Sequence, residues 1–225
     1  MGSGKLATQR TLPGVRAWAI FGAALLAGLG LTTLVLVGDI ESFELNLIEA
    51  VQESPLPGNS VSNLLREATT TQLDIAVVGI PLVVVLWFSG YRWHGLALIV
   101  LLIVLPIVQH ELKEAVDRDR PPFDPDDVWT LPNSRSFPSG HAMSATVVYG
   151  WLLYCAATLP WTPLWRGMAI GISVTVLTLV PLASVYLALH WPSDVVGGYA
   201  WGLTLLLPAM WIAARGYKPG ASNRR

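Results

Sequence analysis

The residues best able to do chemistry fall into three short clusters in the second half of the chain. The first holds two cations seven residues apart, Lys113 and Arg120, followed at once by Pro121 and Pro122. Seven residues make about two helical turns, so a helix that continued to the prolines would carry both cations on one face. The arginine fork and the lysine point charge suit a dianionic phosphate. Taken alone, the cluster also fits a solvated, charged helix end.

The second cluster is Ser139-Gly140-His141, directly before an apolar stretch. Ser139 is a typical N-cap, and Gly140 allows backbone N–H groups to approach an anion closely. A helix N-terminus binds phosphate readily, and His141 beside it could protonate a leaving oxygen. An ordinary serine-capped helix with a surface histidine is the structural alternative.

The third cluster begins at His190 and ends at Asp194. A carboxylate four residues after an imidazole can accept its ring N–H and fix which nitrogen points outward. This pairing activates a histidine as a nucleophile or base, and it also occurs where a histidine only holds a loop.

The elements that must position these clusters are membrane helices. The 225 residues are 53% hydrophobic and only 13% charged, with a mean hydropathy of +0.53, whereas soluble domains carry about 25% charged residues. We therefore predict an all-α polytopic membrane protein, a six-transmembrane-helix bundle with short extracytoplasmic helices. Residues 17–214 form this domain, between cytoplasmic tails at 1–16 and 215–225. The predicted spans are 17–38, 71–89, 94–110, 142–159, 167–189 and 195–214.

Charge distribution orients the bundle. An even number of spans puts both termini on one side, together with nine of the fourteen basic residues: Lys5, Arg10, Arg16, Arg92, Arg166, Arg215, Lys218, Arg224 and Arg225. The positive-inside rule then places both termini in the cytoplasm and all three clusters on the extracytoplasmic face of the plasma (inner) membrane. The net charge of −1 argues against a nucleic-acid partner.

Three further features concern packing and partners. The amphipathic run from Glu41 to Val51 predicts a helix that caps the outer side of the bundle or, alternatively, assists lipid entry. Gly167-xxx-Gly171 and Gly198-xxx-Gly202 would allow close helix approach and permit a homodimer. The single cysteine, Cys155, is interpreted as a small buried apolar residue.

Lys113-x6-Arg120-Pro121 and Pro138-Ser139-Gly140-His141, in this order and topology, resemble the type 2 phosphatidic acid phosphatase family. That family includes bacterial phosphatidylglycerophosphate and undecaprenyl pyrophosphate phosphatases. The resemblance covers roughly residues 90–205 and implies hydrolysis of a membrane lipid phosphate without metal or cofactor. It implies these roles: Lys113, Arg120, Ser139 and Gly140 bind phosphate, His141 protonates the leaving group, and His190, oriented by Asp194, forms a phosphohistidine.

The third motif departs from the family pattern Ser-Arg-x5-His-x3-Asp. Ala183 and Ser184 stand where serine and a phosphate-binding arginine are expected. We weigh three explanations: an introduced substitution that traps a complex, replacement of the missing guanidinium by Arg118 or Arg135, or a pseudo-phosphatase that binds or transports lipid phosphate. Transfer of the phosphoryl group to an acceptor alcohol is also compatible with the same residues.

Overall fold

The computed structural model describes residues 15–54, 58–68, 70–122 and 135–216, and every regular element in these ranges is helical. The predicted tails, 1–16 and 215–225, lie almost entirely outside the described residues. In chain order the elements are α1 (Val15–Val37), α2 (Glu41–Gln52), α3 (Asn59–Ala68), α4 (Thr71–Leu73), the π-helical segment η1 (Asp74–Gly79), α5 (Ile80–Phe88), α6 (Arg92–Val116), α7 (Gly140–Thr158), α8 (Pro163–Tyr186) and α9 (Pro192–Gly216).

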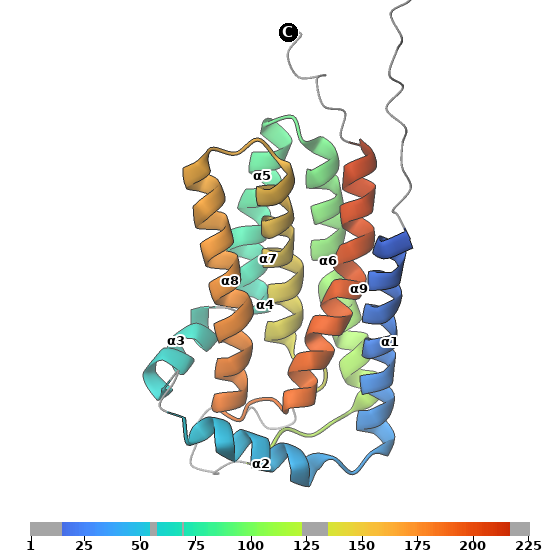
Figure 1. Cartoon of the computed structure of the whole chain (residues 1–225), viewed down its shortest axis with the longest axis vertical. Helices are drawn as coiled ribbons and strands as arrows, with labels where there is room; N and C mark the ends of the chain where they lie inside the picture. The colour runs from blue at the N-terminus through green and yellow to red at the C-terminus, as the bar shows by residue number, and fades with distance from the viewer. Residues whose placement is uncertain (1–14, 55–57, 69, 123–134, 217–225) are drawn as a thin grey trace, which may run out of the picture.

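The long helices stand side by side in one bundle, and α2 lies across one of its ends (Figure 1). The start of α1 and the end of α9 lie together at the opposite end (Figure 1). The prediction of an all-α bundle is confirmed for the described residues. Within the described ranges, four helices are long and apolar enough to cross a membrane: α1, α6, α8 and α9.

Two predicted spans fall short of that measure. The apolar stretch Asp74–Phe88 is too short to qualify. The helix α7 has 19 residues but is less apolar than the four candidate spans. The helix α7 contacts α6, α8 and α9, and polar side chains such as Ser144 and Thr146 are buried along it. Because neighbouring helices cover α7, its side chains do not all have to match lipid.

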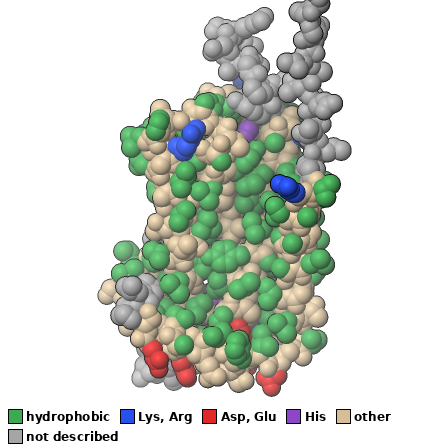
Figure 2. All heavy atoms as spheres, in the orientation of Figure 1, with side chains coloured by type: hydrophobic (Ala, Val, Ile, Leu, Met, Phe, Trp, Pro, Cys, Tyr) green, Lys and Arg blue, Asp and Glu red, His purple; other side chains and the backbone are tan. Residues whose placement is uncertain are grey.

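Side chains of opposite charge lie at opposite ends of the face drawn in Figure 2. Lys and Arg side chains lie toward the end where α1 begins, and Asp and Glu side chains lie at the end capped by α2, with mainly hydrophobic side chains between them (Figure 2). This separation agrees with the charge asymmetry seen in the sequence.

Close packing between α7 and α9 depends on glycine. A Cβ on Gly198 would come within 2.8 Å of the Ser139 carbonyl oxygen, and one on Gly202 within 2.6 Å of Thr146 Cβ. The first turns of α7 and α9 therefore lie in direct contact. The Ser139 N–H donates to the Asp194 carbonyl at 3.0 Å. The other glycine pair differs, because nothing lies within 4 Å of a Cβ on Gly167 or Gly171.

The inner face of α2 is anchored in the bundle, as the capping interpretation predicts. Ile48 is fully buried in a cluster with Ala142, Val185 and Trp191. The Gln52 side chain donates to the Tyr186 carbonyl at 2.9 Å. Glu44, one turn before Ile48, is buried on the same face. A carboxylate in that position requires a partner, which leads to the site itself.

Candidate active site

The two predicted phosphate-binding cations lie where α6 ends. Lys113 is in the last turn of α6, and the helix stops at Val116 because Asp117 takes a left-handed conformation, with φ of 49°. The expectation that one helix carries both cations is therefore wrong: Arg120 lies in the segment after the helix. The Lys113 ammonium donates to the Arg135 carbonyl at 3.0 Å, and the Arg120 guanidinium donates to the Leu189 carbonyl.

The second cluster forms the start of α7. Ser139 is the N-cap, and its hydroxyl accepts from the Ala142 N–H at 3.4 Å, as the sequence predicts. The Gln109 side chain of α6 donates to the Gly140 carbonyl at 2.9 Å. This bond ties the α7 terminus to the helix that carries Lys113. His141, in the first turn, is half-buried.

The third cluster spans the turn between α8 and α9. The N–H groups of Leu189 and His190 both donate to the Ser184 carbonyl, at 3.0 and 3.3 Å. Asp194 follows in the first turn of α9, fully buried. His190 Nδ1 lies 3.5 Å from Asp194 Oδ2, longer than an ordinary hydrogen bond and close enough for electrostatic pairing.

The two histidines face one another across the site. Their ring centroids are 6.3 Å apart at an interplanar angle of 69°. Because Asp194 faces Nδ1, it favours the tautomer that carries its proton there and leaves Nε2 with a lone pair.

The pKa of His190 is lowered to about 4 from its ordinary value of 6.5. Burial is the main cause, and the nearby charges of Arg120 and Lys113 act in the same direction, while Asp194 opposes them. Both predicted phosphate-binding cations thus lie close enough to His190 for their positive charges to lower its pKa. A lowered pKa favours the neutral imidazole, whose free nitrogen lone pair is what a nucleophile or a general base requires.

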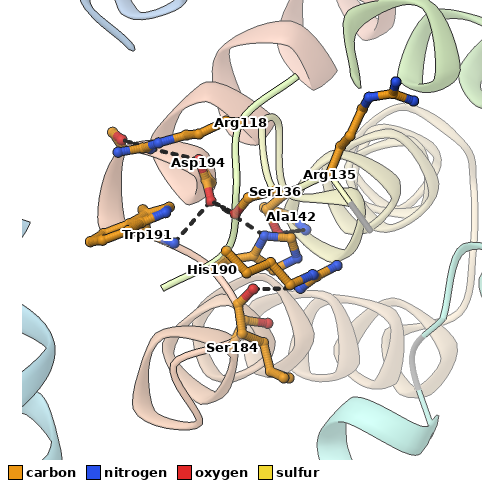
Figure 3. A network of polar contacts seen from close by, with 12 residues as sticks. Arg118, Arg135, Ser136, Ala142, Ser184, His190, Trp191 and Asp194 are labelled. Carbon is orange, nitrogen blue, oxygen red and sulfur yellow. Dashed lines mark hydrogen bonds and ion pairs between the residues drawn. The ribbon is translucent and has the colours of Figure 1, made fainter. Parts of the chain in front are cut away.

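Asp194 is the centre of a polar network, which Figure 3 shows from close by. Its Oδ2 accepts from the Ser136 hydroxyl and, at 2.9 Å, from the Trp191 N–H. Its Oδ1 accepts from the Arg118 guanidinium at 2.8 Å. This carboxylate is therefore held from several sides beside His190.

Asp74 is a third buried carboxylate and lies deeper in the bundle. Asp74 accepts from the Ser144 hydroxyl at 2.8 Å and from the Tyr149 hydroxyl at 3.2 Å. Ser144 lies one turn after His141 in α7. The bond from its hydroxyl to Asp74 therefore connects η1 with the first part of α7. Ionisable groups within a membrane bundle are costly and are usually paired or functional.

The part of the chain that the structure describes contains no group of three or more His, Cys, Asp and Glu side chains arranged to hold a metal ion.

The model of the PAP2 superfamily matches residues 94–217, more than half of the chain and all three clusters. The chain belongs to the PAP2 superfamily. The resemblance inferred from the motifs is thereby confirmed.

Two curated PAP2 relatives match over long stretches. "Phosphatidylglycerophosphatase B" of Bacillus subtilis (strain 168) is 33% identical over 148 residues, which are 63% of this chain and 71% of the relative. "Putative undecaprenyl-diphosphatase YbjG" of Escherichia coli (strain K12) is 29% identical over 185 residues, 80% of this chain and 87% of the relative.

A solved structure has the same fold. The crystal structure of a transmembrane PAP2-type phosphatidylglycerolphosphate phosphatase from Bacillus subtilis aligns with a TM-score of 0.65 and 27% sequence identity. The alignment covers 84% of this chain and 93% of that one.

Position 184, where PAP2 motifs carry arginine, is buried. The Ser184 hydroxyl donates to the Val180 carbonyl of its own helix at 3.0 Å. The two arginines weighed as substitutes already have carboxylate partners: Arg118 pairs with Glu44 and Asp194, and Arg135 pairs with Glu114 and Asp117. Figure 3 shows Arg135 directed away from His190.

Sequence reasoning missed several members of this PAP2 site, above all Glu44 and Ser136. Glu44 did carry a signal, since it falls four residues before Ile48 on the otherwise apolar face of an amphipathic helix. Ser136 carried none, because its bond to Asp194 joins residues 58 positions apart.

Proposed function

We propose that this protein is an integral membrane phosphatase that hydrolyses a lipid phosphate or diphosphate on the extracytoplasmic side through a phosphohistidine. One observation carries the proposal. His190, paired with Asp194, faces His141 at a ring separation of 6.3 Å, and both Lys113 and Arg120 act on the charge of His190.

The chemistry takes two steps. Nε2 of His190 attacks phosphorus, the bond to the leaving oxygen breaks, and His141 gives that oxygen its proton. Water then attacks the phosphohistidine, His141 takes a proton from the water, and the P–N bond breaks to release phosphate. Lys113 and Arg120, with Ser139 and the Gly140 N–H, balance the charge on the phosphoryl oxygens.

Six membrane spans belong to this proposal. Four helices reach the length and apolarity of a span, and α7 and the α4–α5 segment stand beside them in the bundle (Figure 1). With six spans both termini face the cytoplasm, and the site faces outward beneath α2.

A lipid substrate is supported by the site's position and by the relatives. The three clusters lie at helix ends, at the level expected for headgroups, and the relatives are named for phosphatidylglycerophosphate and undecaprenyl diphosphate. We propose these two lipids, and phosphatidic acid as a third, as the substrates to test.

The experiment is phosphate release by detergent-solubilised protein from those three lipids in mixed micelles. We expect release by the wild type and a loss of at least about 1,000-fold in His190→Asn, because the nucleophile is gone. His110→Asn, at an exposed position on α6, is the matched control and should retain activity. A wild type that releases no phosphate from any lipid would contradict the proposal.

The serine at position 184 supports a second candidate, a protein that binds or transports lipid phosphate without turnover. In that case His190→Asn would leave both lipid binding and cellular function unchanged. A phosphatase would lose its cellular function in the same variant.

A further inference from the structure

A buried ion-pair network lies behind Asp194, outside the two histidines. Arg118 Nη2 lies 2.6 Å from Glu44 Oε2, and Nη1 lies 2.8 Å from Asp194 Oδ1. The side chains of Glu44 and Arg118 are only 4% and 6% exposed, and that of Asp194 is fully buried. One guanidinium therefore joins α2 to the first turn of α9.

The two carboxylate oxygens of Asp194 contact different groups. Oδ2 faces His190 and accepts from Ser136 and the Trp191 N–H, whereas Oδ1 accepts from Arg118. A carboxylate held through one oxygen alone could rotate about its Cβ–Cγ bond. The bond from Arg118 to the other oxygen therefore defines the plane in which Asp194 meets His190.

Further contacts hold the Arg118 guanidinium in place. Its Nη1 also donates to the Ser193 hydroxyl at 2.7 Å, and its guanidinium carbon lies 4.8 Å from the centroid of the Trp191 ring. Glu44 completes the arrangement, because its second oxygen accepts from the Ser193 N–H at 2.6 Å. The carboxylate of Glu44 thus contacts both the guanidinium and the α9 terminus.

The ion pairs of Arg118 argue against a direct role for this residue in phosphate binding. Two buried carboxylates, Glu44 and Asp194, share Arg118, so its positive charge is already matched within the protein. A phosphate would have to displace one of those carboxylates to reach it. The proposed phosphate-binding cations differ in their contacts, since Lys113 donates to the Arg135 carbonyl and Arg120 donates to the Leu189 carbonyl.

We propose that Arg118 and Glu44 are positioning residues for the reaction: Arg118 holds Asp194 against His190, and Glu44 of α2 holds Arg118. The surface helix α2 is by this inference a part of the active site as well as a cap on the bundle. The inference rests on the proposed phosphatase function, because it assigns roles within the same site.

The test compares kcat and KM for phosphate release from phosphatidylglycerophosphate and undecaprenyl diphosphate in mixed micelles. We expect Glu44→Gln and Arg118→Gln each to lower kcat by at least tenfold and to change KM by less than threefold. The phosphate-binding cations are untouched, while the nucleophile loses its orientation. Arg118→Lys should recover part of the activity that Arg118→Gln loses.

A double variant gives a sharper readout. Glu44 acts through Arg118, so adding Glu44→Gln to Arg118→Gln should cost no further activity and should raise the melting temperature, since it removes an unpaired buried carboxylate. Glu49→Gln on the exposed face of α2 is the matched control and should behave as wild type.

Melting in detergent identifies the folded variants, and if Arg118→Gln does not fold, Glu44→Gln and Arg118→Lys decide alone. Folded Glu44→Gln with kcat within twofold of wild type would overturn the inference, as would losses that multiply in the double variant. A wild type that is inactive on both lipids and on phosphatidic acid would instead overturn the proposed function, and this inference with it.

Discussion

At the residue scale, position 184 holds a serine close to the backbone of His190. Its backbone carbonyl already accepts from the His190 N–H at 3.3 Å, so a longer side chain at this position would begin next to the nucleophile. Under the proposed function, a guanidinium there would add a charged contact to the phosphate without a change in the proposed reacting groups.

We expect Ser184→Arg to raise kcat/KM for lipid phosphate at least about tenfold, since a desolvated charged contact contributes about 2–5 kcal/mol and about 1.4 kcal/mol corresponds to tenfold. Ser184→Gln, which is also long and polar but uncharged, is the control for volume. Equal kcat/KM in both variants, with normal melting, would show that the missing charge does not limit the reaction.

The protonation of His190 is the second residue-scale prediction. Because its pKa is lowered to about 4, the imidazole should stay neutral in ¹⁵N-histidine NMR spectra at pH 5.5, where an ordinary histidine is mostly protonated. Its signal is assigned by its disappearance in His190→Asn. Lys113→Met removes one of the cations that lower this pKa, so it should move the titration to higher pH.

The same shift has a consequence for stability. Between about pH 6.5 and 4 the unfolded chain binds a proton at His190 that the folded chain does not, so folding stability at this residue falls as the pH falls. A His190 signal that titrates near 6.5 in the wild type would contradict both statements.

At the scale of elements, the contact between α7 and α9 brings the two histidines together, and it depends on Gly198. A methyl group there must displace the Ser139 carbonyl or the Ala142 side chain, since both would lie 2.8 Å away. The contact therefore constrains the same turn that carries His141.

We expect Gly198→Ala to lower the unfolding free energy by about 1–3 kcal/mol, measured by denaturation in detergent, and to reduce kcat. Gly171→Ala is the matched control, because nothing lies within 4 Å of its added Cβ and alanine favours helix over glycine by about 1 kcal/mol. The two variants should change stability in opposite directions, and equal effects would rule out the packing argument.

At the scale of the whole molecule, the opposite placement of acidic and basic side chains predicts the orientation in the membrane (Figure 2). The end capped by α2 should face outward, and the turn between α5 and α6 should face the cytoplasm. The single buried cysteine makes this simple to test.

In a Cys155→Ala background, we expect Ser42→Cys on α2 to react with a membrane-impermeant maleimide in intact cells. Ser89→Cys, in the turn after α5, should react only after the membrane is permeabilised. Both serines are exposed, so differences in labelling report the side of the membrane. The reverse pattern would contradict the proposed topology.

The sequence alone was sufficient to predict the all-α class, the approximate helix ranges and the family. The reason is that these depend on local patterns: apolar stretches long enough for a bilayer, and motifs such as Ser139-Gly140-His141, whose N-cap the structure confirms. The same local logic failed at Arg120, because the left-handed residue Asp117 ends α6 early.

Only the tertiary structure decided which groups support the reacting pair. Arg118 lies 74 residues from Glu44 and 76 from Asp194, and Ser136 lies 58 from Asp194, so no spacing rule relates them. Each is a buried polar group whose partner is set by how α2, α7 and α9 meet. Packing, rather than sequence pattern, therefore determined that Arg118 pairs with Asp194 and that Arg120 donates to Leu189 next to His190.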